Sequence, residues 1–170
     1  MAEAEEEGPQ LQGEEEGGSV EIFVLALKGL TNSKIMKVEG RVEDSRLMML
    51  IESGSTHSFL DEGTAKRLKC PLIQTQPLLV TVANGSKVIS KLACVGFFWE
   101  MQGERFEANL RLLKLGGFDV VLGVDWMKQV SPICFDFNRM EAKFEKKGKL
   151  MTLTGSKELG VCKMIVGRRL

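Results

Sequence analysis

The chain has 170 residues, of which 23 are Lys or Arg and 23 are Asp or Glu, so its formal net charge is zero. This zero is a cancellation, because residues 1–18 hold seven glutamates and no basic residue. The rest of the chain holds all 23 basic side chains and the other 16 acidic ones, which gives it a charge of +7. A chain of this length predicts one domain, here joined to an acidic leader.

The composition argues against several classes of protein. No apolar run approaches the ~20 residues of a membrane-spanning helix. The acidic N-terminus has neither the cationic part nor the apolar part of a secretory signal. We therefore expect no membrane partner. Lys and Arg are scattered and Tyr is absent, which argues against sequence-specific binding of nucleic acid.

The cysteines and the histidine argue against a metal site or another cofactor. The four cysteines are widely spaced and form no C-x-x-C pair, and His57 is the only histidine in the chain. With neither a secretory signal nor a disulfide spacing pattern, we expect reduced thiols and a cytoplasmic or nuclear location. The four cysteines are Cys70, Cys94, Cys134 and Cys162.

Taken in chain order, the sequence predicts four segments. Residues 1–18 cannot bury enough apolar surface to offset the entropy of ordering, so we expect a disordered acidic leader. Residues 19–33 form an N-terminal extension whose apolar run predicts a strand or an interface segment. Residues 34–153 form a mainly β domain, and residues 154–170 form a basic C-terminal tail.

The domain consists of short apolar stretches separated by turn residues, with Asn84-Gly85 as the strongest hairpin signal. Residues 59–68 and 126–130 have a short helical character. This pattern predicts an all-β sandwich or barrel with one or two short helices. Strands are expected at 35–42, 47–51, 78–83, 87–100, 106–115, 120–122, 132–137, 142–145 and 150–153.

Two stretches carry candidate chemistry. Residues 50–59 read Leu-Ile-Glu-Ser-Gly-Ser-Thr-His-Ser-Phe, so an apolar strand carries the Glu52 carboxyl into a turn that Gly54 makes tight. On this stretch alone, an exposed Glu at an ordinary strand end is the simpler interpretation. Residues 115–127 hold a buried apolar strand that ends at Gly123, where another backbone can pass closely.

Together and in this order, the two stretches resemble the retropepsin-like aspartic proteases of gypsy-type LTR retrotransposons, especially the plant type. That family reads apolar-apolar-Asp-Ser-Gly at the first site and Leu-Gly-Gly-apolar-Asp-Val-Val-Leu-Gly further along the chain. Two more blocks agree with the family pattern, Val-Thr-Val-Ala-Asn-Gly at residues 80–85 and Pro-Ile-Cys-Phe-Asp-Phe at residues 132–137. The likeness covers residues 34–153.

The resemblance implies the retropepsin fold, a small closed β-barrel, assembled as a two-fold homodimer in which each chain supplies one acid-Ser/Thr-Gly loop. The sequence agrees, because no other acid in the chain is followed by Ser/Thr-Gly. A peptide or polyprotein substrate, such as the Gag-Pol polyprotein of a retroelement, would lie in the groove between the subunits. Two carboxyls about 3 Å apart would share one proton and activate a water molecule.

The resemblance also implies roles for residues of this chain. The catalytic loop is Glu52, Ser53 and Gly54, supported by Ser55 and Thr56. The flap that closes over substrate is Ala83, Asn84, Gly85 and Ser86. The core strand near the site is Asp119, Val120, Val121, Leu122 and Gly123. No metal or other cofactor is implied.

The sequence departs from the family at the centre of the site, because Glu52 stands where the family has Asp. The extra methylene moves the carboxyl by about 1–1.5 Å unless the side chain folds back. Misplacement near 1 Å can cost ~10²-fold in rate, so we expect activity to be much reduced or absent.

Three functions stay open at this point. The first is a homodimeric aspartic endopeptidase impaired by Glu52. The second is a catalytically inactive descendant that still dimerises and binds a peptide or a partner protein in its groove. The third and weakest is a basic RNA-associated module, suggested by the four lysines within residues 143–149.

Overall fold

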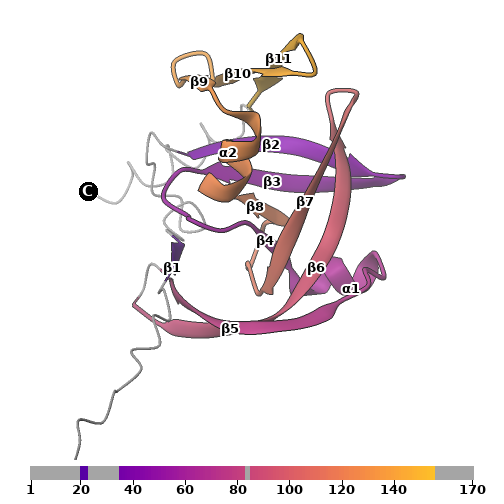
Figure 1. Ribbon diagram of the computed structural model, residues 1–170, viewed down its shortest axis with the longest axis vertical. Helices are drawn as coiled ribbons and strands as arrows, with labels where there is room; N and C mark the ends of the chain where they lie inside the picture. The colour runs from indigo at the N-terminus through magenta and orange to yellow at the C-terminus, as the bar shows by residue number, and fades with distance from the viewer. Residues whose placement is uncertain (1–19, 23–34, 83–84, 156–170) are drawn as a thin grey trace, which may run out of the picture.

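The computed structural model describes residues 20–22, 35–82 and 85–155 of the chain (Figure 1). The predictions for residues 1–18, and for most of the N-terminal extension and the C-terminal tail, lie outside these residues. The described ranges form eleven strands and two short helices, which confirms the mainly β class. Neither of these two helices has the length and apolar character needed to cross a membrane.

The bounds of the elements are as follows. The strands are β1 (Val20–Ile22), β2 (Ile35–Val42), β3 (Ser45–Glu52), β4 (Phe59–Asp61), β5 (Ile73–Val82), β6 (Lys87–Met101), β7 (Glu104–Leu113), β8 (Val120–Leu122), β9 (Ile133–Asp136), β10 (Glu141–Lys146) and β11 (Lys149–Thr154). The helices are α1 (Glu62–Arg67) and α2 (Val124–Val130).

Eight strands form one sheet in the order β1-β5-β6-β2-β3-β8-β4-β7. β7 also pairs with β6, so the pairings run in a ring through β6, β2, β3, β8, β4 and β7. β5 extends this ring beyond β6, and the short β1 pairs in parallel with β5, with Val20 opposite Val80. β9, β10 and β11 form a separate antiparallel sheet, which lies at the top of Figure 1.

Tight two-residue turns join two pairs of neighbouring strands. Glu43 and Asp44 link β2 to β3 in a two-residue turn, and Gln102 and Gly103 link β6 to β7 in another. Glu43 has a φ of 51°, and Gln102 and Gly103 have φ values of 49° and 80°. Positive φ angles of this kind let a two-residue hairpin follow the right-handed twist of its strands.

Two predicted elements differ from the structure. The helix expected at residues 59–68 is wrong in its first part, because that part is β4 and pairs with β7 and β8. The helix begins only after Asp61, whose side chain caps it by accepting a hydrogen bond from the Thr64 N–H. β5 begins earlier than expected, at Ile73, because a register shift accommodates Pro77 within the strand.

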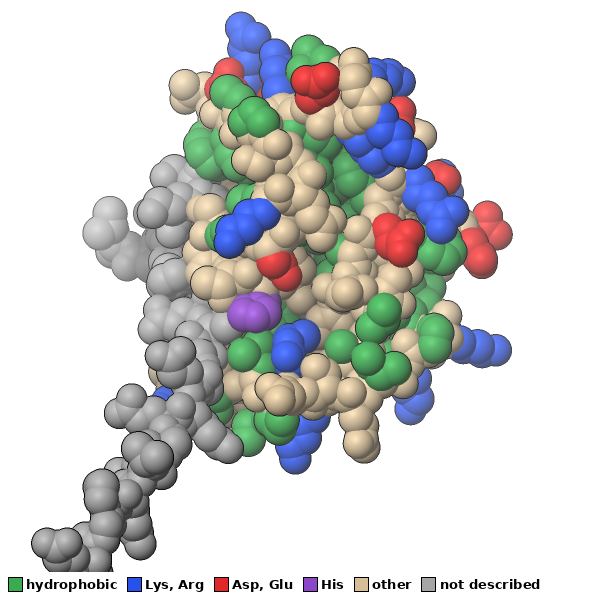
Figure 2. Space-filling model, in the orientation of Figure 1, with side chains coloured by type: hydrophobic (Ala, Val, Ile, Leu, Met, Phe, Trp, Pro, Cys, Tyr) green, Lys and Arg blue, Asp and Glu red, His purple; other side chains and the backbone are tan. Residues whose placement is uncertain are grey.

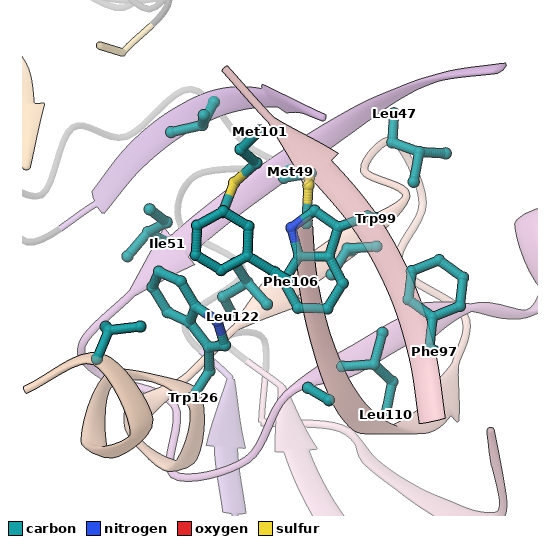
Figure 3. Close-up of a cluster of buried hydrophobic side chains, with 14 of the residues drawn as sticks. Leu47, Met49, Ile51, Phe97, Trp99, Met101, Phe106, Leu110, Leu122 and Trp126 are labelled. Carbon is teal, nitrogen blue, oxygen red and sulfur yellow. The ribbon is translucent and has the colours of Figure 1, made fainter. Parts of the chain in front are cut away.

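The main core lies inside the ring of strands (Figure 3). Met49 and Ile51 of β3 point into it, together with a group of large aromatic side chains. Trp99 stacks against both Phe97 and Phe106, with ring centroids 6.0 and 5.9 Å apart. Offset rings at such distances attract each other beyond the effect of burial alone.

A second apolar cluster lies on the other face of β3, against β5. Leu50 of β3 packs there with Leu78 and Val80 of β5. Burial of both faces explains why β3 reads as a continuous apolar run rather than an alternating one. Because side chains alternate along a strand, Glu52 projects from the same face as Leu50, beside its cross-strand partner Ile35.

The three-stranded sheet packs one face on the main core. Its inward side chains on β10 and β11 are buried, and Phe144 makes an edge-to-face contact with Trp126 of α2 at 6.1 Å. Phe106 of β7 contacts the same Phe144 ring at 6.0 Å. The segment after α2 is therefore part of one folded unit with the ring of strands. The buried side chains are Ala142, Phe144, Met151 and Leu153, and the partly buried Ile133 and Phe135 of β9 pack against the same core.

We predict that Phe144→Ala lowers the free energy of unfolding by about 3–5 kcal/mol, because it leaves a cavity beside the rings of Phe106 and Trp126. Phe98→Ala is the matched control, since Phe98 is 44 % exposed and lies over Arg105 at the surface. Phe98→Ala should lower the free energy of unfolding by about 1 kcal/mol or less. Urea unfolding of both variants measures the difference. Equal losses would contradict the packing of this sheet on the core.

Candidate active site

Glu52 is the last residue of β3, and its side chain is fully buried, with 0 % of the residue exposed. The chain turns directly after it, and the Gly54 N–H donates a hydrogen bond of 2.8 Å to Glu52 Oε1. The backbone closes the same turn, because the Ser55 N–H donates to the Glu52 carbonyl at 3.3 Å. The Glu52 side chain is therefore folded back over its own turn, and the extra methylene does not carry this oxygen out of the loop.

The second motif lies directly against this turn. β8 runs parallel to β3 with Leu122 opposite Ile51, so Gly123 follows at the end where the turn begins. A Cβ atom on Gly123 would lie 2.3 Å from the His57 carbonyl oxygen and 2.6 Å from that of Ser55. Any side chain here would displace backbone. The close backbone approach predicted at Gly123 is confirmed.

Hydrogen bonds join the two motifs across this contact. The Val124 N–H donates to the Ser55 carbonyl at 2.8 Å, and the Gly123 N–H donates to Ser58 Oγ at 2.9 Å. Ser58 in turn donates to the Asp125 carboxylate from both its hydroxyl and its backbone N–H. The turn after β3 and the start of α2 are thus held together as one unit.

Ser58 and Asp125 belong to this unit but are missing from the site predicted from sequence. Ser58 is 2 % exposed, and its hydroxyl both accepts and donates a hydrogen bond. Asp125 also accepts from the Trp126 N–H at 2.7 Å in the first turn of α2. The available signal was a hydroxyl next to His57 and an acid two residues after Gly123. It becomes informative only when the two stretches are known to touch.

The other loop residues support the shape of the turn. Ser55 is fully buried and donates from Oγ to the His57 carbonyl at 2.7 Å. Thr56 Oγ1 and His57 Nδ1 are hydrogen-bonded at 2.9 Å. Ser53 is exposed, next to the buried Glu52. The single histidine is visible on the face of the molecule shown in Figure 2 (purple), so this side of the loop faces solvent.

Asp119 lies at the other end of β8, away from the acidic turn. Its N–H donates to the Met48 carbonyl at 2.8 Å, and its Oδ2 accepts from the Met48 N–H at 2.7 Å. Its Oδ1 accepts from Thr64 Oγ1 and lies 3.5 Å from Arg67 Nη2. Asp119 therefore fastens α1 to β3, and only the C-terminal end of the expected core strand adjoins the turn. Between the two ends lie the buried residues Val120, Val121 and Leu122.

The expected flap is the turn of the β5–β6 hairpin. Residues 83–84 lie outside the described residues, whereas Gly85 and Ser86 are described and exposed. Gly85 has a φ of +82°, and its N–H closes the turn onto the end of β5 at 2.8 Å. Val88 and Ile89, which are adjacent and so face opposite ways, are 40 % and 55 % exposed. The β6 side of this hairpin end is therefore exposed, whereas Val80 of β5, the partner of Val88, is buried in the second apolar cluster.

A hollow of about 510 Å³ lies apart from the acidic turn, between the start of β7, α2 and the end of β10. Lys146 Nζ lies 4.0 Å from the centre of the Phe106 ring there, and burial lowers the pKa of this ammonium group below its usual range.

In the described part of the chain, no group of three or more His, Cys, Asp or Glu side chains could hold a metal ion.

We predict that Gly123→Ala destabilises the chain by about 3 kcal/mol or more, because its methyl group overlaps two carbonyl oxygens that cannot move without opening the turn. Gly63→Ala in α1 is the matched control. Its Cβ would come no closer than 3.2 Å to the Asp61 side chain, and alanine favours the helix. Thermal unfolding compares the two variants. A Gly123→Ala chain as stable as the control would contradict this contact.

Comparison with known proteins places the chain in a family. The sequence profile of the retroviral aspartyl protease family matches residues 23–146, well over half of the chain. No curated protein sequence matches the chain significantly.

Three solved structures are similar to this chain. The retroviral protease-like domain of Ddi1 from Leishmania major matches with a TM-score of 0.51 at 12 % identity, covering 73 % of this chain and 94 % of that one. EIAV protease complexed with the inhibitor HBY-793 has a TM-score of 0.44 at 17 % identity, covering 55 % and 85 %. A retropepsin-like aspartic protease from Rickettsia conorii has a TM-score of 0.43 at 13 % identity, covering 70 % and 87 %. The extent of the profile match, together with the fold shared with the Ddi1 domain, shows that this chain belongs to the retroviral aspartyl protease family.

Proposed function

We propose that this chain is one subunit of a homodimeric aspartic endopeptidase in which Glu52 supplies the reacting carboxyl. One observation carries the proposal: a buried acid at the end of β3 keeps one oxygen in the acid-Ser-Gly turn, 2.8 Å from the Gly54 nitrogen. The Gly123 contact and the bonds from Ser58 to Asp125 hold this turn in place before any substrate arrives. Such preorganisation is what positioning of a catalytic group requires.

Two copies are proposed because each chain carries one acid-Ser-Gly sequence. Residues 34–153 would form the subunit, and the Glu52 carboxyls of both copies would meet at a two-fold axis. Two carboxyls that close cannot both ionise, so they would share one proton and titrate as a pair. The ionised carboxyl would accept a proton from the attacking water, and the protonated one would donate to the oxygen of the scissile carbonyl.

The proposed substrate is an extended peptide within a polyprotein of a gypsy-type retroelement, bound in the groove between the two subunits. The β5–β6 hairpin supports this idea. Its end carries exposed apolar side chains, Val88 and Ile89, on opposite faces. A hairpin whose tip and one strand are exposed can close over a peptide and exclude water from the reaction. Gly85 and Ser86, with residues 83–84, would form the tip of this flap.

We expect the glutamate to slow the reaction, although its carboxyl stays in the site. One oxygen stays in the turn, but the added methylene changes the direction in which the carboxyl faces its counterpart. In a two-fold site this change occurs twice. Since misplacement near 1 Å can cost ~10²-fold in rate, we expect an impaired enzyme rather than a fully active one.

The same methylene favours a second candidate function, a catalytically inactive dimer that binds a peptide or a partner protein in its groove. An RNA-binding role is less well supported, because acidic and basic side chains are mixed over the three-stranded sheet (Figure 2). Lys149 pairs with Glu104 at 3.1 Å, and Lys143 lies 4.0 Å from Glu141. These neighbours reduce the positive field that a phosphate backbone would need.

We predict that Glu52→Asp raises kcat/KM on a library of extended peptides by about 10²-fold or more, because the shorter side chain restores the position of the carboxyl. Cleavage should occur at acidic to neutral pH and should be blocked by a statine-type inhibitor. Mass spectrometry of the products measures the rates and shows the cleaved bonds.

Two control variants accompany this assay. Glu62→Asp makes the same chemical change at an exposed position of α1 and should leave the rate unaltered. Glu52→Gln removes the ionisable group, so this variant should cleave no peptide. Cleavage by Glu52→Asp alone would favour the inactive dimer as the role of the present chain. If neither the Glu nor the Asp form cleaves any peptide while both are dimers, the proposed endopeptidase is wrong.

A further inference from the structure

Two cysteines that are distant in the sequence meet at the base of the β5–β6 hairpin. Cys70 follows α1 and is fixed there because its N–H donates to the Ala65 carbonyl at 3.0 Å. Cys94 lies in β6 and is 3 % exposed in the main core, against which the half-buried Cys70 also packs. The two thiol groups are close enough for each to affect the pKa of the other. Both are free cysteines in this structure.

The strand register also places the segments that carry Cys70 and Cys94 near each other. Ile73 of β5 pairs with Ala93 of β6, so the chain just before β5 runs past the chain just after Ala93. Cys70 lies three residues before Ile73, and Cys94 lies one residue after Ala93. The two segments therefore run side by side, and a disulfide between them requires the sulfur atoms to come within the S–S bond length of about 2.0 Å.

We propose that Cys70 and Cys94 form an intramolecular disulfide when a small-molecule disulfide is present, and that this bond closes residues 70–94 into a covalent loop. The loop contains all of β5, the turn at the tip of the hairpin and the first half of β6. The bond therefore clips the base of the hairpin that carries the expected flap. It would limit how far the hairpin can move away from α1.

The reaction with oxidised glutathione proceeds in two balanced steps. The Cys70 thiolate, which is the more accessible, attacks one sulfur of oxidised glutathione and releases one glutathione thiolate. The Cys94 thiolate then attacks Cys70 Sγ and releases the second. The two protein thiols are oxidised, oxidised glutathione is reduced to two thiols, and the two cysteine protons end on them. Burial raises the pKa of Cys94 to about 11, so the exchange needs long incubation near pH 8.5.

The test uses the full chain, first reduced and then incubated with an excess of oxidised glutathione, quenched with acid and alkylated. We expect a cross-linked peptide pair containing Cys70 and Cys94, with glutathione retained on neither of these two residues. Cys134→Ala is the matched control, because Cys134 is the exposed cysteine of the described part, and it should form the bridge as before. Cys70→Ala should leave Cys94 reduced, and Cys94→Ala should leave a glutathione adduct on Cys70.

A second readout guards against variants that fold poorly. The oxidised wild-type chain should unfold several degrees above the reduced chain, and dithiothreitol should reverse this shift. The idea is overturned if the cross-linked peptides contain Cys134 or Cys162. It is overturned equally if the glutathione adduct on Cys70 accumulates in the wild-type chain without a bridge, or if the chain forms only intermolecular disulfides.

The effect on activity rests on the proposed function. In the Glu52→Asp form, oxidation should lower kcat/KM several-fold, and dithiothreitol should restore it. The mass measurement does not depend on cleavage, so the two ideas fail separately. A bridge in a chain that cleaves nothing would leave the disulfide standing and remove the endopeptidase. A chain that cleaves peptides but forms no bridge would leave the endopeptidase standing and remove the disulfide.

Discussion

The approach of the Gly123 backbone to the carbonyl oxygens of Ser55 and His57 fixes the shape of the acidic turn. Because no side chain separates them, the chain leaving β8 passes directly against the chain leaving β3, and the Val124 N–H reaches the turn. The Asp125 carboxylate then holds the turn from the start of α2. Since β3 and β8 are neighbouring parallel strands, this one contact couples the sheet, the turn and the helix. The position of the Glu52 carboxyl depends on all three.

Packing alone does not explain why an acid ends β3. The strand is apolar and buried on both faces, and a carboxyl taken out of water costs free energy unless hydrogen bonds replace its hydration. Glu52 recovers part of this cost through the Gly54 N–H. An apolar residue would fit the second cluster beside Leu50 without any such cost. The proposed chemical role of the carboxyl would account for its place here, and the aromatic core around Trp99 contributes stability elsewhere in the fold.

Local chemistry made much of the fold and the site predictable. The apolar run of β3, the tight turns and the glycine at Gly123 all follow from backbone and burial rules that act within a few residues. The start of α1 was not predictable in this way, because pairing with β7 and β8 makes its first residues a strand. Ser58 with Asp125, and Cys70 with Cys94, gain their meaning only from contacts between distant segments. Asp119 was expected beside the site, but parallel pairing places it at the far end of β8.

The proposed active site requires a second copy of the chain, since one copy supplies one carboxyl in one turn. Sedimentation equilibrium of the full chain over a wide range of concentrations tests this requirement most directly. We predict a reversible monomer–dimer equilibrium whose upper limit is twice the chain mass of 18.9 kDa, shifted toward the dimer by a statine-type inhibitor. A mass of 18.9 kDa at every concentration, with and without the inhibitor, would contradict it.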